Sequence, residues 1–207
     1  MSNAAAVESA LQTGPASAAA LMQQLKISQP ELSRALSTPQ RAGRVVKLGA
    51  TRGARYALPR LVAGAGSWPL FRVDATGAIH EFGTFNALHP HHYFCSNGPS
   101  QVRGLTAAIP YFLQDQRPAG FLGRTVPANC PEIALPPRVT DWTDDHYLHW
   151  LTQRGSDCVS DLIAGAAAFD RYLLLLKSRV AINAADRETS YPLLAAEVLK
   201  RGLPGSS

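Results

Sequence analysis

Basic side chains are concentrated in the first 60 residues of this 207-residue chain. That segment holds eight Lys or Arg residues against two acidic ones, a net charge of +6, whereas residues 61–207 hold 12 basic and 13 acidic residues, a net charge of −1. Guanidinium and ammonium groups bind phosphate oxygens and displace the counterions condensed on nucleic acids. The asymmetry therefore predicts a segment that binds a polyanion, joined to a nearly neutral body.

The polar groups best suited to reach DNA bases lie on one short segment. Residues 28–31 have the pattern S-x-x-E, a capping box that starts a helix. Leucines four residues apart give this helix an apolar face, and Thr38-Pro39 is expected to end it at about Ser37, because a residue before proline disfavours the helical conformation. The opposite face presents small polar and basic side chains to a major groove: Gln29, Ser33 and Arg34.

A predicted β-hairpin supplies the other basic candidates. Two short helices, 4–13 and 18–25, precede the capped helix, and two strands, 44–48 and 54–58, follow it around a turn with two glycines. The hairpin carries side chains for contacts with phosphates or a minor groove: Arg44, Lys47, Arg52 and Arg55. Three helices and a hairpin are the order of a winged helix-turn-helix, so we predict that residues 1–60 form such a domain and bind duplex DNA. A unit of the same order that only docks another protein is the alternative.

A second domain is expected after a small, glycine-rich linker at residues 61–67. Residues 68–207 are predicted to form a small mixed α+β unit, so the fold class of the whole chain is α+β. We expect the strands first, at 69–74, 78–86 and 92–95. Helices are expected at 107–114, 144–153, 156–163, 169–180 and 190–200.

Two stretches of this second domain carry a family resemblance. Residues 111–124, YFLQDQRPAGFLGR, resemble the element F-x-x-L-L-P-E-G-x-x-R, with Pro-Ala-Gly in place of Pro-Glu-Gly. Residues 154–162, RGSDCVSDL, resemble G-x-D-x-x-G-A-L, with Ser160 where glycine is usual. From Trp68 onward the chain thus resembles the N-terminal subdomain of the HipA family of toxin serine/threonine kinases. A winged helix fused to such a subdomain resembles the YjjJ-like branch of that family.

The resemblance implies that the family's kinase core lies beyond this sequence. Residues 203–207 resemble the start of its glycine-rich ATP loop, and the nucleotide lysine and the catalytic and metal-binding aspartates would follow. The sequence itself contains no P-loop, kinase glycine loop, H-R-D or D-F-G motif. We therefore expect no catalytic residue, cofactor or metal site in this chain, and no phosphotransfer by it alone.

Three roles remain open: a DNA-binding regulator, the regulatory part of a toxin kinase, and an antitoxin-like module that restrains a separate HipA-type kinase. The expected partners are duplex DNA and a kinase domain or a HipB-like antitoxin, with no membrane; self-association into a homo-oligomer is a further alternative. A kinase body would cover the C-terminal helix, which otherwise exposes an apolar patch of Leu193, Leu194 and Leu199.

The histidines offer the main competing chemistry. A loop cluster has ligands for a soft divalent metal: His89, His91, His92 and Cys95. Consecutive loop histidines converge poorly on one ion, so a polar loop is the favoured interpretation. His146 and His149 are neighbours on a predicted helix but lack the H-E-x-x-H pattern and third ligand of zinc hydrolases.

The cysteines and the apolar runs indicate the compartment. Cys95, Cys130 and Cys158 are odd in number and widely spaced, so we expect free thiols and no disulfide framework. No apolar run approaches the ~20 residues needed to cross a bilayer, and residues 1–6 show no signal-peptide pattern. The expected compartment is the cytoplasm.

Overall fold

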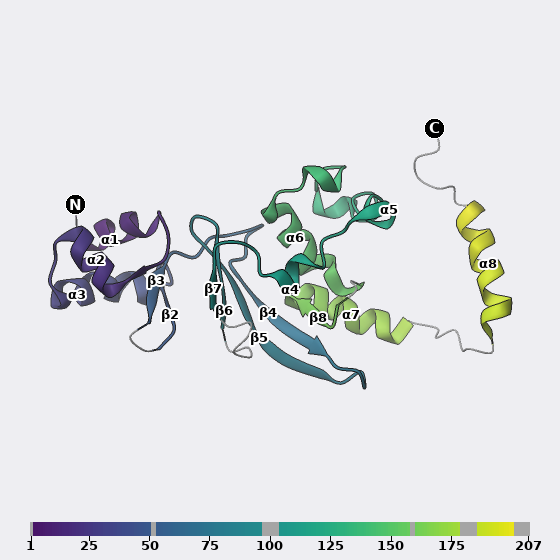
Figure 1. Ribbon diagram of the computed structural model, residues 1–207, viewed down its shortest axis with the longest axis horizontal. Helices are drawn as coiled ribbons and strands as arrows, with labels where there is room; N and C mark the ends of the chain where they lie inside the picture. The colour runs from purple at the N-terminus through teal and green to yellow at the C-terminus, as the bar shows by residue number, and fades with distance from the viewer. Residues whose placement is uncertain (1, 51–52, 97–103, 158–159, 179–185, 201–207) are drawn as a thin grey trace.

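The computed structural model describes residues 2–50, 53–96, 104–157, 160–178 and 186–200, and within them it shows an α+β fold with two antiparallel sheets. Figure 1 shows the N-terminal helices at one end, a larger sheet in the middle and further helices beyond that sheet. The predicted α+β class is confirmed at this level.

The smaller sheet and three helices form an N-terminal unit. Its elements are, in chain order, α1 (Asn3–Leu11), β1 (Ala16–Ser17), α2 (Ala18–Leu25), α3 (Gln29–Arg41), β2 (Val46–Leu48) and β3 (Arg55–Ala57). The strands lie in the order β1-β3-β2 and pair antiparallel, so the predicted hairpin forms, and β1 adds a strand that the sequence did not predict. The core between helices and sheet consists of apolar side chains: Val7, Leu11, Leu21, Leu32, Leu36, Val45 and Leu58.

Side-chain hydrogen bonds start α2 and α3 where the sequence predicts. The Ser17 hydroxyl accepts a hydrogen bond from the amide of Ala20 at 3.2 Å. The carboxylate of Glu31 accepts hydrogen bonds from the amide of Ser28 at 2.8 Å and from its hydroxyl at 2.7 Å. Such contacts tie down the first turns, where backbone amides have no partner within the helix.

Helix α3 is longer than predicted. The expected end at Ser37 is wrong, because the helix continues through Pro39 to Arg41. Proline near a helix C-terminus removes one hydrogen bond of the helix, and here its ring is buried on the apolar face. The carbonyl of Pro39 also accepts hydrogen bonds from the amides of Arg44 (2.9 Å) and Val45 (3.3 Å). Burial and this C-terminal pairing offset the local cost of the proline.

The larger sheet has five described strands. They are β4 (Ser67–Val73), β5 (Ile79–Leu88), β6 (His92–Ser96), β7 (Gly104–Thr106) and β8 (Leu162–Ala164). Their order is β7-β6-β5-β4-β8, with every neighbouring pair antiparallel. The three strands predicted from the sequence are confirmed as β4, β5 and β6.

Strand β8 corrects the prediction of a helix over 156–163. Residues 158–159 of that span lie outside the described residues, but Leu162, Ile163 and Ala164 pair with β4 and are all buried. A short apolar run does not reveal from its own sequence whether it is a buried strand or part of a helix. Gly165, with a φ of +93°, then turns the chain into the next helix.

Helices cover the second part of the chain. They are α4 (Tyr111–Gln114), α5 (Gly120–Gly123), α6 (Asp144–Arg154), α7 (Ala166–Ser178) and α8 (Arg187–Lys200), with short 3-10 turns η1 (Pro131–Ile133), η2 (Val139–Asp141) and η3 (Gly155–Asp157). Helix α4 begins later than predicted because Pro110 takes its N-cap position. The main core joins sheet and helices: Phe85, Tyr93, Leu113, Trp142, Tyr147, Leu148 and Leu151.

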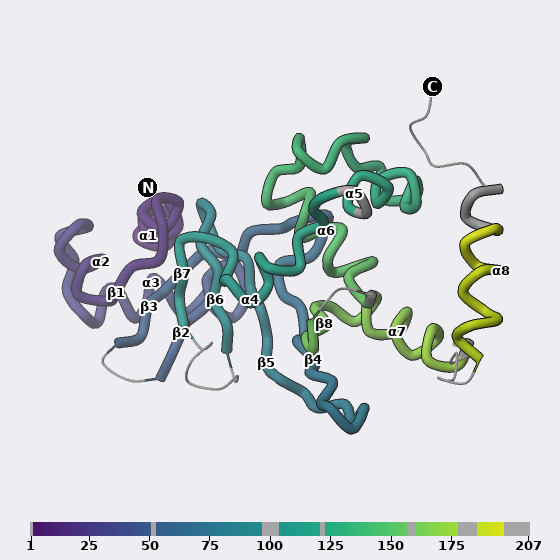
Figure 2. The backbone as a smooth tube through the Cα atoms, turned by 45° about the vertical axis from the view of Figure 1, so that its right-hand side comes forward, coloured from purple at the N-terminus to yellow at the C-terminus, as the bar shows by residue number. Residues whose placement is uncertain are grey.

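The position of α8 and the lengths of the described helices bear on function. Figures 1 and 2 both show α8 away from the two sheets and from α4, α5 and α6. The last residues of the helix predicted at 169–180 lie outside the described residues, as does the side chain of Leu199. Among the residues that the structure describes, no helix has the length and apolar character needed to cross a membrane.

The N-terminal unit packs directly on the larger sheet. Leu48 and Ala57 of the hairpin are buried against Leu88 at the end of β5. The backbone continues this contact, since the amide of Arg60 donates to the carbonyl of Ala87 at 2.9 Å. Within the stretch expected as a linker, Val62 and Ala65 exchange two hydrogen bonds around a tight turn. The two parts of the chain are therefore held together by apolar and backbone contacts.

Candidate nucleic-acid interface

Helix α3 presents a polar face opposite its buried leucines. Gln29, Ser33 and Arg34, the three residues predicted to reach base edges, are all exposed on this helix. The Nε of Arg34 donates to the carbonyl of Pro30 at 3.3 Å, which orients the guanidinium along the first turns. Hydrogen bonds from the Ser28 hydroxyl and amide, with the nearby charge of Arg34, hold the pKa of Glu31 below its usual value.

Two more residues join this face because α3 is longer than predicted. Thr38 and Arg41 are exposed, at helical spacing from Arg34, and Lys26 is exposed just before α3. The sequence carried a signal for them, since the apolar spacing of Leu32 and Leu36 continues at Pro39. Because Pro39 predicts that the helix ends at about Ser37, Thr38 and Arg41 were not among the predicted DNA-binding residues.

The two strands of the hairpin place Lys47 and Arg55 on different faces. Lys47 pairs with Tyr56, and Leu48 pairs with Arg55. Because side chains alternate between the faces of a strand and cross-strand partners share one face, Lys47 and Arg55 lie on opposite faces of the hairpin. Both are exposed. Arg52, the fourth hairpin candidate, lies outside the described residues.

Arg44 is already engaged within the N-terminal unit. Its guanidinium binds Glu8 of α1, with Nε at 3.1 Å and a terminal nitrogen at 3.0 Å from one carboxylate oxygen. This contact ties the start of the hairpin to α1 and neutralises one of the eight positive charges.

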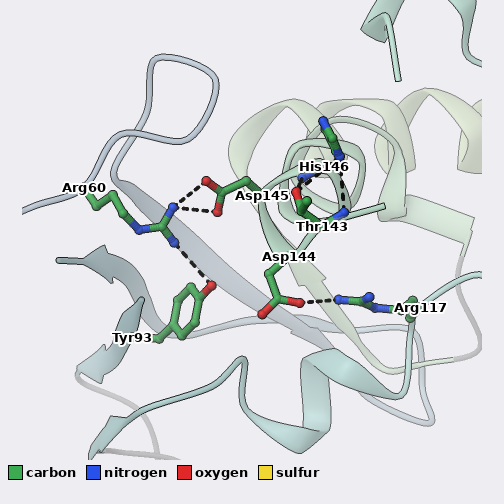
Figure 3. Close-up of polar contacts among 7 residues, drawn as sticks. All are labelled: Arg60, Tyr93, Arg117, Thr143, Asp144, Asp145 and His146. Carbon is green, nitrogen blue, oxygen red and sulfur yellow. Dashed lines mark hydrogen bonds and ion pairs between the residues drawn. The ribbon is translucent and has the colours of Figure 1, made fainter. Parts of the chain in front are cut away.

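Arg60 is engaged as well, at the junction with the larger sheet. One terminal nitrogen of its buried guanidinium lies 2.5 and 2.6 Å from the two carboxylate oxygens of Asp145 on α6, and the other donates to the hydroxyl of Tyr93 at 3.2 Å (Figure 3). Burial raises the pKa of Tyr93 to about 12. The charge of Arg60 therefore holds the two parts of the chain together and does not face a solvent-exposed ligand.

A second ion pair starts from the residue next to Asp145. Arg117 donates to Asp144 at 2.6 Å, and its guanidinium lies over the ring of Tyr147, 4.7 Å from the ring centre (Figure 3). Thr143 caps α6 just before these two carboxylates, with its hydroxyl accepting a hydrogen bond from the amide of His146 at 3.3 Å. The first turn of α6 is thus bound to partners on both sides.

The larger sheet and the helices around it match a known protein family. The model of the family described as "YjjJ-like toxin, middle domain" matches residues 64–173, more than half of the chain. The chain belongs to the YjjJ-like toxin family. It is 31% identical over 198 residues to "Toxin YjjJ" of Escherichia coli (strain K12), a match that covers 94% of this chain and 43% of that protein. No solved structure matches the chain.

The family assignment confirms the resemblance seen in the sequence. Both stretches, residues 111–124 and 154–162, lie inside the matched middle domain. This YjjJ-like chain spans less than half the length of the curated relative. The matched span begins after α1–α3 and the hairpin, so the family's middle domain corresponds to the larger sheet with its helices.

The histidines and cysteines of this YjjJ-like chain do not form a metal site within the part that the structure describes. Among the described residues, no group of three His, Cys, Asp or Glu side chains could hold a metal ion. Cys95 and Cys130 are free and buried, as expected, whereas Cys158 lies outside the described residues. Burial raises the pKa of the Cys95 thiol to about 12, which suppresses its reactive thiolate. Burial, with a smaller effect of His146, lowers the pKa of His149.

Proposed function

We propose that the N-terminal unit of this YjjJ-like protein is a winged helix-turn-helix that binds duplex DNA. The observation that carries the proposal is the element order α1-β1-α2-α3-β2-β3 with its sheet order β1-β3-β2. Helix α3 is the longest helix of this unit, and its exposed face is free of apolar side chains except Pro30. A helix of this kind can enter a major groove while the hairpin reaches the flanking phosphates.

The exposed residues divide into two roles. Gln29 and Arg34, near the N-terminus of α3, are assigned to base edges, with Ser33 beside them. Lys47 and Arg55, together with Arg52, are assigned to phosphates, which carry no sequence information. Arg44 contributes to DNA binding only through the face that its pair with Glu8 leaves open.

Salt dependence tests the electrostatic part of the proposal. Of eight basic side chains, Arg44 and Arg60 are held by Glu8 and Asp145, and Arg34 is assigned to base edges, which leaves five for phosphates. The slope of log K against log salt is about −0.9 per phosphate neutralised, so it should be negative and no steeper than about −5. Fluorescence anisotropy with the whole chain and a labelled random duplex measures it. A slope near zero would exclude a phosphate-based interface.

Substitutions test the division of roles, using a duplex enriched from random sequence by the protein itself. Gln29→Ala and Arg34→Ala should reduce discrimination against random duplex, by roughly 1–3 kcal/mol per lost base contact. Lys47→Ala and Arg55→Ala should weaken binding to both duplexes alike. Arg187→Ala, which removes a positive charge on α8, is the matched control and should change neither. If only the hairpin variants changed discrimination, the two roles would be reversed.

We further propose that residues 1–207 supply no catalytic group for phosphoryl transfer. That reaction needs a phosphate-cradling loop, positioned metal ions and a residue that orients the nucleophile, and the sequence contains none of the corresponding motifs. Purified chain incubated with radiolabelled ATP and magnesium should give no turnover above buffer. Turnover that co-purifies with the chain through successive columns would overturn this part.

A second role, binding of a kinase body or another partner, is favoured by an exposed apolar surface on α8, with further exposed leucines on α7. These side chains are 44–73% exposed: Tyr191, Leu193 and Leu194 on α8, and Leu174 and Leu176 on α7. Exposed leucines on neighbouring turns are typical of surfaces that another protein covers. Static light scattering should show concentration-dependent association of the chain, and Leu193→Ser with Leu194→Ser should reduce it. A strictly monomeric chain would count against self-association through this surface.

A further inference from the structure

A cavity of about 640 Å³ lies between residues 117–124 and 137–140. Three of the residues that line it are arginines, Arg117, Arg124 and Arg138, and none of the described lining residues is acidic. Neither the N-terminal unit nor the hairpin contributes to it, so the cavity is separate from the proposed DNA interface. Its volume falls within the range of about 300–1,000 Å³ that is typical of small-molecule sites.

The three arginines differ in how they are held. Arg117 is fixed between Asp144, at 2.6 Å, and the ring of Tyr147. Its Nε is buried and has no hydrogen-bond partner among the described residues. Arg124 and Arg138 are exposed and form no ion pair with any described residue. After the charge of Asp144 is subtracted from those of the three arginines, the cavity wall carries a net charge of about +2.

The backbone gives the cavity a fixed wall. Gly120 has a φ of +65°, a conformation that side chains disfavour. A Cβ atom on Gly123 would lie 2.8 Å from the carbonyl carbon of Pro118, so the chain can fold back this closely only with glycine there. Pro118, Pro137 and Val139 add apolar surface beside the arginines. The site therefore combines an apolar wall with the exposed guanidinium groups of Arg124 and Arg138, which form no ion pair with any described residue.

We propose that this cavity binds a small phosphate monoester of about nucleotide size. A guanidinium group binds phosphate or carboxylate through two parallel hydrogen bonds. A phosphate monoester carries a charge of about −1.5 to −2 at pH 7, which matches the wall, whereas a single carboxylate would leave about one positive charge unbalanced. The proline and valine surfaces contact the sugar and base, and Arg124 and Arg138 bind the phosphate. This site is independent of DNA binding by α3.

Isothermal titration calorimetry on the whole chain tests the site, with adenosine monophosphate as the probe. Adenosine and inorganic phosphate, titrated separately, measure the affinity for each half of the ligand. A phosphoserine peptide tests whether the phosphate monoester belongs to a protein ligand. Adenosine monophosphate should bind saturably below about 1 mM and more tightly than either half. Arg124→Ala and Arg138→Ala should each weaken it about tenfold or more. Arg187→Ala, which removes an exposed charge on α8, should leave the affinity for adenosine monophosphate unchanged.

Any of the following results would overturn the proposal. Absence of binding at about 1 mM, or equal affinity for inorganic phosphate and the nucleotide, would remove the nucleotide-sized site. Tighter binding of the phosphopeptide would replace the small molecule with a protein ligand. An equal loss in Arg187→Ala would reduce the effect to general charge. Arg124 and Arg138 form no ion pair with any described residue, so their variants should keep the wild-type circular dichroism and DNA affinity, which separates this test from that of the DNA interface.

Discussion

The ion pair between Arg60 and Asp145 should stabilise the junction far more than a surface pair does. The Arg60 side chain is 9% exposed, whereas that of Asp145 is 43% exposed. Asp145→Asn keeps the shape and one acceptor oxygen but leaves a buried guanidinium without its counter-charge. Removing one partner of a fully buried pair costs about 3–5 kcal/mol. Because water reaches Asp145, we expect a smaller loss of about 2–3 kcal/mol in the free energy of unfolding.

Urea unfolding followed by tryptophan fluorescence measures this loss, since Trp142, just before α6, and Trp150, on α6, both lie in the core. The matched control is Asp161→Asn, whose pair with Arg72 is about half exposed on both sides (54% and 48%). An exposed pair contributes only about 0–1 kcal/mol. If the two substitutions cost the same within about 0.5 kcal/mol, burial of Arg60 does not govern the strength of the junction and the reasoning is refuted.

Three further predictions concern stability and titration. Gly165→Ala should destabilise the fold by about 2 kcal/mol or more in urea unfolding, because φ is positive and a Cβ would lie 2.8 Å from the carbonyl oxygen of Thr152; a loss under about 0.5 kcal/mol would refute this. Thr143→Ala should cost about 1 kcal/mol in the same assay by removing the cap of α6, and Thr143→Ser should restore it. The neutral Tyr93 phenol should contribute stability that is complete below about pH 10, its unfolded pKa, and is lost as the pH rises to its folded pKa of about 12; ultraviolet titration showing Tyr93 ionised near pH 10 in folded protein would contradict it.

Local signals in the sequence were sufficient for much of the N-terminal unit. The serines that precede α2 and α3 and the glycine turn between the two predicted strands act through neighbours within a few residues, so their effects can be read in order along the chain. The end of α3 was missed because Pro39 is a local signal that a tertiary contact overrides. Its burial, and the hydrogen bonds from Arg44 and Val45, depend on the fold around it.

Long-range pairing explains the other differences. Strand β8 lies beside β4, about 90 residues earlier in the chain, and only that pairing distinguishes its buried run from a helix. The same limit applies to the candidate site. Nothing near Arg60 in the sequence indicates that Asp145 neutralises it, so composition alone overstated the charge available to DNA.

The first turn of α6 connects the parts of the molecule that carry the two proposals. Successive residues of a helix point about 100° apart, so the adjacent carboxylates reach different neighbours. Asp145 binds Arg60, next to the proposed DNA-binding unit, and Asp144 binds Arg117 at the wall of the cavity (Figure 3). The hydroxyl of Thr143 caps α6 and fixes its first turn of backbone, and this turn positions both carboxylates. Fraying of that turn would release both contacts together, which makes the start of α6 the element that sets the geometry of the junction and of the cavity at once.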